Sequence, residues 1–308
     1  MDLSVLIVSY NSREMLRLCL ESLMEFGRDV SIEIIVVDNS SKDGSVKMVR
    51  ELFPDVTVKA NDRNLGFSGA VNQAFELSSG DFVFLMNPDA RLRSAIFAGM
   101  LKFWDEYEDA GVLAPRIEYP DQTLHVSARR FITLLGAIMD LFQIHLYLPD
   151  NPVAKRFVYN NWPHNHVSKV DWVTGAVIMM RRTVFRDCGM LDHRFFMYFE
   201  DMDLCMSVKK AGYGVYFSPE FTVIHDHAKG GSHTLPVRRV DYFISLNQYL
   251  YKHKGFLAGT FFRLCMILWG AVYLLIRVIS YFFRKKQTSF MDQIDVPLRL
   301  IFKKSFKG

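Results

Sequence analysis

The sequence predicts an α/β fold with a mostly parallel central sheet, followed by a C-terminal helical tail. Short runs rich in Val, Ile, Leu and Phe recur through the first 90 residues, and segments with apolar residues at helical spacing lie between them. Such runs are typical of strands buried on both faces, and their alternation with helices is typical of parallel sheets with right-handed crossovers. The composition becomes basic and apolar toward the C-terminus, so we place a globular body at residues 1–235 and the tail at residues 236–308.

Four strands are expected in the first 90 residues, at Leu3 to Tyr10, Ile32 to Asp38, Val56 to Lys59 and Asp81 to Met86. Helical spacing follows Ser12, a capping residue type, and returns from Ala70 to Phe75. The ligands of parallel α/β sheets gather at the carboxyl ends of the strands. Three of these ends are polar, and we expect them to line one site: Ser9-Tyr10-Asn11, Asp38-Asn39-Ser40 and Asn87-Pro88-Asp89.

Asp89, directly after a buried strand, allows two interpretations. A carboxylate there is placed to hold a divalent cation bound to phosphate oxygens, because Mg²⁺ and Mn²⁺ prefer oxygen ligands. Alternatively, Asn87-Pro88-Asp89 is a turn whose aspartate caps a helix expected to begin near Ser94. Taken alone, the segment favours the turn.

The second half of the body carries an acidic cluster. Residues 118–169 are irregular and either contribute to a binding site or pack on the surface. After this stretch, regular patterns predict a strand from Trp172 to Arg182, a helix that ends at Gly212 and a strand that ends at His225. Glu200, Asp201 and Asp203 crowd the start of that helix, where acidic residues favour the helix dipole. Because aromatic residues precede them, they also suit a proton-accepting base beside an apolar wall.

Two further segments suggest ligand contacts. His225 precedes Gly230-Gly231-Ser232, so it is either structural or a metal ligand beneath a mobile lid. Asn64-Leu65-Gly66-Phe67 precedes a helix whose first backbone amides could face an anion.

Several function classes lose their usual support. The sequence has no G-x-G-x-x-G, G-x-x-x-x-G-K-[ST] or G-x-S-x-G motif, which argues against dinucleotide oxidoreductases, P-loop phosphotransferases and covalent hydrolases. The net charge of +4 is mild and no RNA-binding signature is present, so no nucleic acid partner is expected. Four scattered cysteines fit a reducing compartment, and the N-terminus lacks a signal-peptide pattern.

The tail differs from the body in charge and hydropathy. Residues 252–308 carry 11 Lys and Arg against 2 Asp and Glu, whereas the rest of the chain carries 26 against 31. The longest apolar run, Leu264 to Ile276, has 13 residues, about 20 Å as a helix against roughly 30 Å of bilayer hydrocarbon. Arg263, Gly270, Arg277 and Arg284 lie near one stripe, which favours a helix in the membrane interface. A spanning or re-entrant helix and a buried helix of a soluble dimer are the alternatives.

Taken in order, seven segments resemble the family 2 glycosyltransferases, inverting enzymes with the GT-A fold of nucleotide-diphospho-sugar transferases. They are VSYN at 8–11, VVDNSS at 36–41, NLGF at 64–67, MNPDA at 86–90, WVTGAVIMMRR at 172–182, FFMYFEDMDLC at 195–205 and VIH at 223–225. The asparagine-rich VVDNSS and NPDA are most similar to the rhamnosyltransferase-like branch, which builds bacterial surface polysaccharides.

The resemblance implies a role for each matching residue. Asp38 would hydrogen-bond the nucleotide base, with Ser9 and Asn11 lining the same pocket. Asp89 matches the last carboxylate of the family's D-x-D motif, whose first position here is Asn87, and it would bind Mg²⁺ or Mn²⁺ together with His225. Asp201 matches the general base of the family's ED motif, and Glu200 would orient the base or the acceptor. The remaining residues expected at the nucleotide-sugar site are Asn64, Gly66, Asn87, Trp172 and Gly175.

The implied activity is transfer of a single sugar, with inversion, from a dTDP- or UDP-sugar to a lipid-linked saccharide. Rhamnose from dTDP-rhamnose is the expected donor, and UDP-galactofuranose is an alternative. The Q-x-x-R-W motif of processive members is absent, which favours addition of one sugar. Residues 255–286 are expected to bind an anionic membrane surface, at the cytoplasmic face of the bacterial inner membrane, as a peripheral or monotopic enzyme. A homo-oligomer, and a non-catalytic scaffold of a glycan assembly complex, are the other hypotheses.

Overall fold

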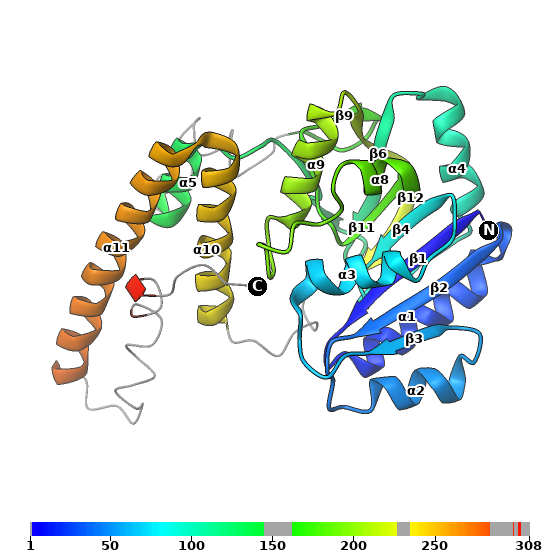
Figure 1. The fold of residues 1–308 in the computed structure, drawn as a ribbon, viewed down its shortest axis with the longest axis horizontal. Coiled ribbons are helices and arrows are strands. Elements are labelled where there is room, and N and C mark those ends of the chain that lie inside the picture. The colour runs from blue at the N-terminus through cyan, green and yellow to red at the C-terminus, as the bar shows by residue number, and fades with distance from the viewer. Residues whose placement is uncertain (1, 145–161, 227–234, 284–297, 299–300, 303–308) are drawn as a thin grey trace. The chain divides into compact units, whose positions relative to one another are not determined.

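The computed structural model describes residues 2–144, 162–226, 235–283, 298 and 301–302. The chain divides into two compact units (Figure 1). The sheet unit comprises Met1–Phe131, Trp162–Phe196 and Glu200–Ser232, and the helical unit comprises Ile132–Asn161, Met197–Phe199 and His233–Gly308. Three residues that directly precede Glu200 therefore belong to the helical unit.

The first half of the central sheet is parallel, as the sequence predicts. β1 (Leu3–Ser9) lies between β2 (Ile32–Asp38) and β4 (Phe82–Met86), and β3 (Thr57–Ala60) pairs with β2. The register sets Ser9 opposite Asp38, so the polar ends of β1 and β2 are neighbours. The connecting helices in Figure 1 are α1 (Arg13–Phe26), followed by the short η1 (Gly27–Asp29), α2 (Ser45–Leu52) and α3 (Gly66–Glu76).

The second half of the sheet contains antiparallel as well as parallel pairs. β11 (Val177–Arg181) runs antiparallel to β4 and to β6 (Ala110–Glu118). β12 (Gly214–His225) is parallel to β6, and β5 (Ala90–Leu92) pairs antiparallel with β12. The strand order is β3-β2-β1-β4-β11-β6-β12-β5. β11 begins beside the end of β4, where the Asn87 amide donates to the Ala176 carbonyl at 2.8 Å. From this point β11 runs back along β4, so the two strands are antiparallel.

Shorter elements complete the sheet unit. β7 (Leu124–His125) pairs with β6, β9 (Ser168–Lys169) with β12, and β8 (Ala128–Arg129) with β10 (Trp172–Val173) in a separate two-stranded sheet. The helices are α4 (Phe97–Glu106), α8 (Arg182–Asp187) and α9 (Glu200–Lys210). The run expected as one strand from Trp172 to Arg182 is divided, because β10 pairs with β8 whereas β11 joins the central sheet.

Helices cover both faces of the central sheet. Val5 and Ile7 of β1 share one core cluster with residues of α1 and α4. Leu6 and Val8 share the second cluster with residues of α3, α8 and α9. All four β1 side chains are at most 8% exposed. Burial of the strands on both faces explains why they appear in the sequence as continuous apolar runs.

The helical unit contains α5 (Leu134–Leu141), α10 (Leu235–Lys254) and α11 (Phe256–Phe283). The chain turns between α10 and α11 at Gly255, whose φ of +88° is a conformation that favours glycine. Asn247 of α10 donates from Nδ2 to the Gly259 carbonyl of α11 at 2.7 Å. The two helices therefore form an antiparallel hairpin.

Residues 197–199 pack against α10. The Ser245 hydroxyl donates to the Met197 carbonyl at 2.8 Å. The Phe199 ring, 5% exposed, lies 5.0 Å from the Tyr242 ring between centroids. Tyr198 and Phe199 have φ values of +70° and +68°, an uncommon conformation for bulky residues that costs of order 1–3 kcal/mol each. Packing on α10 holds this strained backbone in place.

α11 is longer than the apolar run in the sequence indicates. It has 28 residues, about 42 Å at 1.5 Å per residue. Among the described residues, its segment Phe256–Ile279 is long and apolar enough to cross a membrane. One face is buried, with Phe262 and Met266 at most 1% exposed. The opposite face is exposed and apolar along its length: Leu257, Phe261, Leu264, Leu268, Val272, Leu275 and Ile279.

The arginine stripe lies on the buried side of α11. At 100° per residue, Arg263 and Arg277 project with Phe262, Met266 and Gly270, away from the exposed apolar face. The Arg263 guanidinium donates to the Ile301 carbonyl at 2.8 Å, and the Arg277 guanidinium lies 4.9 Å from the centre of the Tyr273 ring. The sequence predicted this stripe beside a lipid-facing surface, whereas the structure turns it toward the protein. Arg284-Lys285-Lys286 lie outside the described residues.

Candidate active site

The ends of β1 and β2 form the first part of the site. Asp38 is 2% exposed, and its Oδ1 accepts a hydrogen bond from the Ser41 amide at 2.8 Å. Its Oδ2 is buried and has no hydrogen-bond partner among the described residues. The Ser9 carbonyl accepts from the Asn39 amide at 2.8 Å, which fixes the two strand ends together. A buried carboxylate oxygen is thus left to accept a hydrogen bond from a ligand.

Asn11 joins the loops that follow these two strands. Its φ is +49°, a left-handed conformation that asparagine tolerates. The Asn11 amide donates to Ser41 Oγ at 2.8 Å, and its Oδ1 accepts from the Lys42 amide at 2.8 Å. Asn11 therefore stabilises the backbone around Asp38.

The Asn64-Leu65-Gly66-Phe67 segment has a role different from an open anion site. The Gly66 amide donates to Asn64 Oδ1 at 2.8 Å, and the Phe67 amide donates to the Phe196 carbonyl at 2.9 Å. Gly66 has φ of +79°, and a Cβ there would lie 2.7 Å from the Phe196 carbonyl oxygen. Only glycine fits at position 66, because any side chain would collide with Phe196. The segment therefore packs against the loop that leads to α9.

Asp89 and His225 meet although 136 residues separate them in the chain. Asp89 Oδ1 lies 2.9 Å from His225 Nε2, and the two side chains are 10% and 3% exposed. The Asp226 amide also donates to the Asp89 carbonyl at 2.9 Å. α4 begins only at Phe97, so Asp89 does not cap it.

This pair fits a divalent cation. A carboxylate oxygen and an imidazole nitrogen face each other, a donor set that Mn²⁺ accepts, and a phosphate-bound cation needs only one or two protein ligands. Among the described residues no group of three or more His, Cys, Asp or Glu side chains could hold a metal by themselves. The remaining ligands would have to come from substrate and water. The glycines expected to cover this site, Gly230 and Gly231, lie outside the described residues.

The second part of the site is the first turn of α9. Glu200 is 8% exposed, and its Oε2 has no hydrogen-bond partner among the described residues. Burial raises the pKa of the Glu200 carboxyl well above its usual range, and the Asp201 charge adds to the rise. Burial also raises the pKa of the Asp201 carboxyl, although hydrogen bonds from the Gly175 and Met202 amides oppose the rise. Two carboxyls with high proton affinity therefore sit side by side.

The turn between β10 and β11 joins the two parts. The Gly175 amide donates to Asp201 Oδ2 at 2.9 Å, and the next residue, Ala176, accepts the Asn87 amide at 2.8 Å. A Cβ on Gly175 would lie 3.2 Å from the Asp201 Cβ. Trp172, on β10, donates from its indole nitrogen to the Arg130 carbonyl at 2.9 Å. The consecutive residues Gly175 and Ala176 thus hydrogen-bond to Asp201 and to the Asn87-Pro88-Asp89 loop, respectively.

Two residues that the sequence did not single out also lie in this region. The His125 ring, on β7, is 5.5 Å from the His225 ring between centroids. Arg129, on β8, has a charge that acts on the Asp201 carboxyl. Both belong to the irregular stretch 118–169, where strands of two residues leave no periodic pattern.

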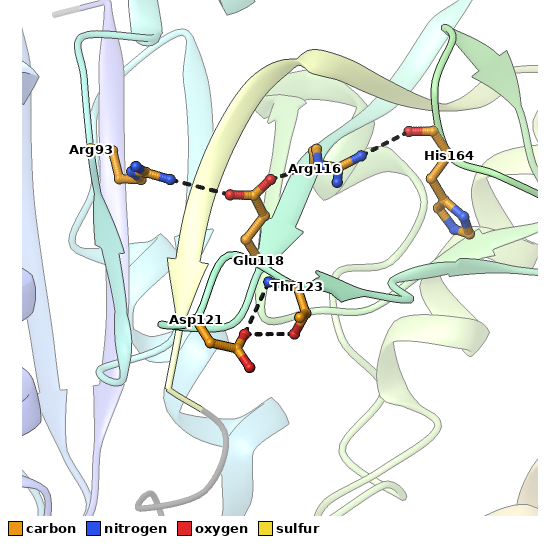
Figure 2. Close-up of polar contacts among 6 residues, drawn as sticks. All are labelled: Arg93, Arg116, Glu118, Asp121, Thr123 and His164. Carbon is orange, nitrogen blue, oxygen red and sulfur yellow. Dashed lines mark hydrogen bonds and ion pairs between the residues drawn. The ribbon is translucent and has the colours of Figure 1, made fainter.

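A charged network joins Arg116 and Glu118 at the end of β6 to Arg93, the residue after β5 (Figure 2). Glu118 of β6 lies between two guanidinium groups, 3.2 Å from that of Arg93 and 2.8 Å from that of Arg116. Arg116 also donates to the His164 carbonyl at 3.3 Å. By register, Glu118 is opposite Ile224, the residue before His225.

Related sequences agree with this picture. The family model of glycosyl transferase family 2 matches residues 4–188. The chain is 28% identical over 237 residues to the N-acetylglucosaminyl-diphospho-decaprenol L-rhamnosyltransferase of Mycobacterium tuberculosis, across 73% of this chain and 76% of that one. It is 24% identical over 229 residues to the rhamnosyltransferase WbbL of Escherichia coli K12, across 72% and 82%.

Solved structures share the fold. The mannosyltransferase PcManGT from Pyrobaculum calidifontis, in complex with GDP-Man and Mn²⁺, is similar at a TM-score of 0.54 and 15% identity, across 97% of this chain and 84% of that one. GalNAc-T7 with UDP, GalNAc and Mn²⁺ is similar at a TM-score of 0.57 and 17% identity, across 80% and 47%. The GT-A fold expected from the sequence is therefore confirmed, with a mixed central sheet.

Proposed function

The chain belongs to glycosyl transferase family 2 and is a glycosyltransferase, and we propose that it transfers a single rhamnosyl group from dTDP-rhamnose to a lipid-linked saccharide, with inversion at the anomeric carbon. Two relatives are rhamnosyltransferases, and one of them is named for a diphospho-decaprenol acceptor. Addition of one sugar in the synthesis of a bacterial surface polysaccharide is the corresponding role.

One observation carries this proposal: Gly175 and Ala176 hold two acidic sites at a fixed separation. Gly175 donates to Asp201, and Ala176 accepts from the loop that contains Asp89. An inverting transfer needs two such sites, one for the departing diphosphate and one for the acceptor proton, on opposite sides of the anomeric carbon. The pair Asp89 and His225 suits the first site, and Asp201 suits the second.

The donor side uses Asp38 and Asp89. The buried Oδ2 of Asp38, which has no hydrogen-bond partner among the described residues, would accept the imide N–H that thymine and uracil share, so either a dTDP- or a UDP-sugar would satisfy it. Asp89 and His225 would hold Mg²⁺ or Mn²⁺, and this cation would neutralise the charge of the leaving nucleoside diphosphate.

The acceptor side uses Asp201. Its carboxylate takes the proton of an acceptor hydroxyl while the hydroxyl oxygen forms a bond to the anomeric carbon, and the bond from that carbon to the diphosphate oxygen breaks. The raised pKa of Asp201 increases its capacity to accept the proton. Glu200 adjoins it on α9 and would orient the acceptor through Oε2.

A donor panel tests the proposal. Release of nucleoside diphosphate would be measured with dTDP-rhamnose, UDP-galactofuranose and other nucleotide sugars, with NMR of the product to assign the anomeric configuration. We expect Asp201→Asn to lower kcat by about 10²–10⁴-fold and Asp89→Ala to abolish the response to Mn²⁺. Asp187→Asn, at an exposed carboxylate of α8, is the matched control and should behave as wild type. Full activity of Asp201→Asn would refute the assigned base, and release from UDP-galactofuranose alone would refute the donor.

The helical unit supports a membrane location for this reaction. The exposed face of α11 is apolar from Leu257 to Ile279 and carries no charged residue. This face spans about 33 Å, close to the roughly 30 Å of a bilayer's hydrocarbon. We propose that it contacts lipid at the cytoplasmic face of the bacterial inner membrane, with basic residues nearby in the tail attracted to anionic headgroups.

Flotation with anionic liposomes tests the membrane contact. Replacement of Leu264 and Leu268 by glutamate should abolish flotation, because both side chains are at least 60% exposed on the apolar face. Leu52→Glu is the matched control, because Leu52 is 58% exposed on α2 of the sheet unit. Equal flotation of wild type and the α11 variant would overturn the proposal, and a dimer that dissociates in the variant would identify a second copy as the partner.

A further inference from the structure

The strands β8 and β10 form a short ribbon that ends at Ser127. They pair antiparallel, with Ala128 opposite Val173. The Thr174 amide extends the pairing by donating to the Ser127 carbonyl at 2.9 Å. Ser127 is therefore the next residue of the ribbon, opposite Thr174, and its carbonyl is already occupied.

Ser127 connects to both acidic parts of the site. On the donor side it is two residues from His125, at most about 7 Å along the chain, and the His125 ring lies 5.5 Å from the His225 ring between centroids. On the acceptor side its ribbon partner precedes Gly175, whose amide donates to Asp201 Oδ2 at 2.9 Å. The end of the ribbon thus joins the region of the proposed cation to that of the proposed base.

The hydroxyl of Ser127 is buried. The residue is 1% exposed, and its Oγ has no hydrogen-bond partner in the part of the chain that the structure describes. Asp38 Oδ2 and Glu200 Oε2 are buried in the same way, and the proposed reaction gives each of them a substrate group. Because an unpaired buried hydroxyl is unfavourable, such atoms in folded proteins usually have a partner or a function. Ser127 Oγ therefore calls for a ligand as well.

The direction of the Ser127 side chain follows from its neighbour. Ala128 and its partner Val173 are fully buried in the second core cluster. Successive side chains along a strand point to opposite faces, and the bond from the Thr174 amide continues the strand pairing to Ser127. The Ser127 side chain therefore points away from that core, on the opposite face of the ribbon.

A hydroxyl of the transferred sugar matches this position. A serine hydroxyl both donates and accepts, and a sugar hydroxyl does the same. During an inverting transfer the anomeric carbon lies between the departing diphosphate and the attacking oxygen, so the sugar ring lies between the cation site and the base. Ser127 is adjacent to the residues that line both, whereas the backbone groups of Gly175 and Ala176 there already have partners.

We propose that Ser127 is a specificity-determining residue whose hydroxyl hydrogen-bonds a hydroxyl of the sugar being transferred. The proposal rests on the proposed glycosyl transfer and adds a contact to the sugar, which neither Asp38 nor Asp89 supplies. Ser127 takes no part in making or breaking bonds. It therefore contributes to binding of the nucleotide sugar and not to binding of the nucleoside diphosphate alone.

Binding calorimetry with the full-length protein and Mn²⁺ tests this role. Ser127→Ala should bind dTDP as wild type does and dTDP-rhamnose about 2–10-fold more weakly, which corresponds to loss of one neutral hydrogen bond. Ser78→Ala is the matched control, because the buried Ser78 hydroxyl donates to the Phe75 carbonyl at 2.6 Å and accepts from Arg182 at 2.7 Å. Both of its affinities should match wild type. An equal loss for dTDP and dTDP-rhamnose in Ser127→Ala, or no loss for either, would overturn the proposal.

Donor analogues that each lack one sugar hydroxyl identify the contact. The analogue without the partner of Ser127 should bind wild type and Ser127→Ala with equal affinity, and the other analogues should keep the difference between the two proteins. A difference that persists with every analogue would contradict the proposal. A loss confined to the KM of the acceptor would also contradict it, because it would assign the hydroxyl to the acceptor saccharide.

Thermal unfolding provides a readout that needs no substrate. Ser127→Ala should keep or raise the Tm, because it removes a buried hydroxyl that has no protein partner, whereas Ser78→Ala should lower the Tm. An equal fall in both variants would overturn the proposal, since it would show that the Ser127 hydroxyl is bonded within the protein. If dTDP-rhamnose does not bind and another nucleotide sugar shows the Ser127 difference, the proposed donor fails and the role of Ser127 stands.

Discussion

Replacing Gly175 by alanine should lower kcat by up to about tenfold while the protein stays folded. A Cβ at this position would lie 3.2 Å from the Asp201 Cβ and 3.8 Å from Oδ2. Carbon atoms in proteins prefer separations of about 3.5–4.0 Å. The Asp201 side chain must therefore retreat by a few tenths of an ångström, roughly the difference between these separations.

The magnitude follows from the hydrogen bond that this movement weakens. The Gly175 amide donates to Asp201 Oδ2 at 2.9 Å. Bonds to charged groups contribute about 1.5–3 kcal/mol, so loss of roughly half of one costs up to about 1.5 kcal/mol, a factor of up to about ten in rate. The same bond lowers the pKa of Asp201, so its weakening should also move the acidic limb of kcat to higher pH.

Steady-state kinetics with the preferred donor is the assay. We expect kcat to fall in Gly175→Ala and further in Gly175→Val, with KM for the donor unchanged because Asp38 and Asp89 are untouched. Thermal unfolding of each variant checks that the fold is retained. A wild-type kcat in Gly175→Ala, or a rise in donor KM without a fall in kcat, would show that the turn does not position the base.

Three other outcomes are expected. Mn²⁺ should raise the Tm of the wild type, with about 2.7 kcal/mol of added stability at a hundred times Kd, and Asp89→Ala should show no rise; an equal rise in both would place the cation elsewhere. Gly66→Ala should destabilise the fold by about 1–3 kcal/mol in chemical denaturation, because its φ is +79° and the Phe196 carbonyl blocks a Cβ; an unchanged midpoint would contradict this. Partial burial would raise the pKa of Glu33, yet hydrogen bonds from Ser4, Ser79 and Gly80 lower it overall. Its stabilisation is present above the unfolded pKa and lost as pH falls through the folded pKa, so Glu33→Gln should reduce Tm at neutral pH and progressively less as the pH is lowered; a reduction that does not change with pH would rule the effect out.

The parts of the fold that the sequence predicted are those with strong local patterns of apolar residues. β1 and β2 are buried on both faces, so their apolar runs and their polar ends at Ser9 and Asp38 were visible. The role of Asp89 was ambiguous, because β5, which separates it from α4, has only three residues and could not be recognised in the sequence. The structure removes the capping alternative by placing Asp89 against His225.

Features that depend on pairing between distant segments could not be predicted. The direction of β11 depends on the contact between Ala176 and Asn87, which no local pattern records. Arg129 is placed opposite Trp172 by a strand of two residues, which is too short to leave a periodic pattern. In the tail, the apolar run of the sequence ends before Arg277, whereas α11 continues to Phe283. The Arg277 side chain points away from the exposed face and lies over the Tyr273 ring, so it does not interrupt the apolar surface. Helix length and side-chain direction together, rather than composition, set the exposed apolar surface of α11.

Residues 197–199 change how a water-soluble form of this enzyme should be made. A protein shortened before α10 would keep every side chain assigned to the donor, yet it would lose Ser245 and Tyr242, which support Met197 and Phe199 directly ahead of Glu200. Exposing the Phe199 ring alone costs about 1.5–3 kcal/mol. The strained backbone before the base would then relax. Under the proposed lipid contact, polar replacements on the outer face of α11, with α10 left intact, are therefore the changes expected to release the enzyme from a membrane without disturbing the residues before Glu200.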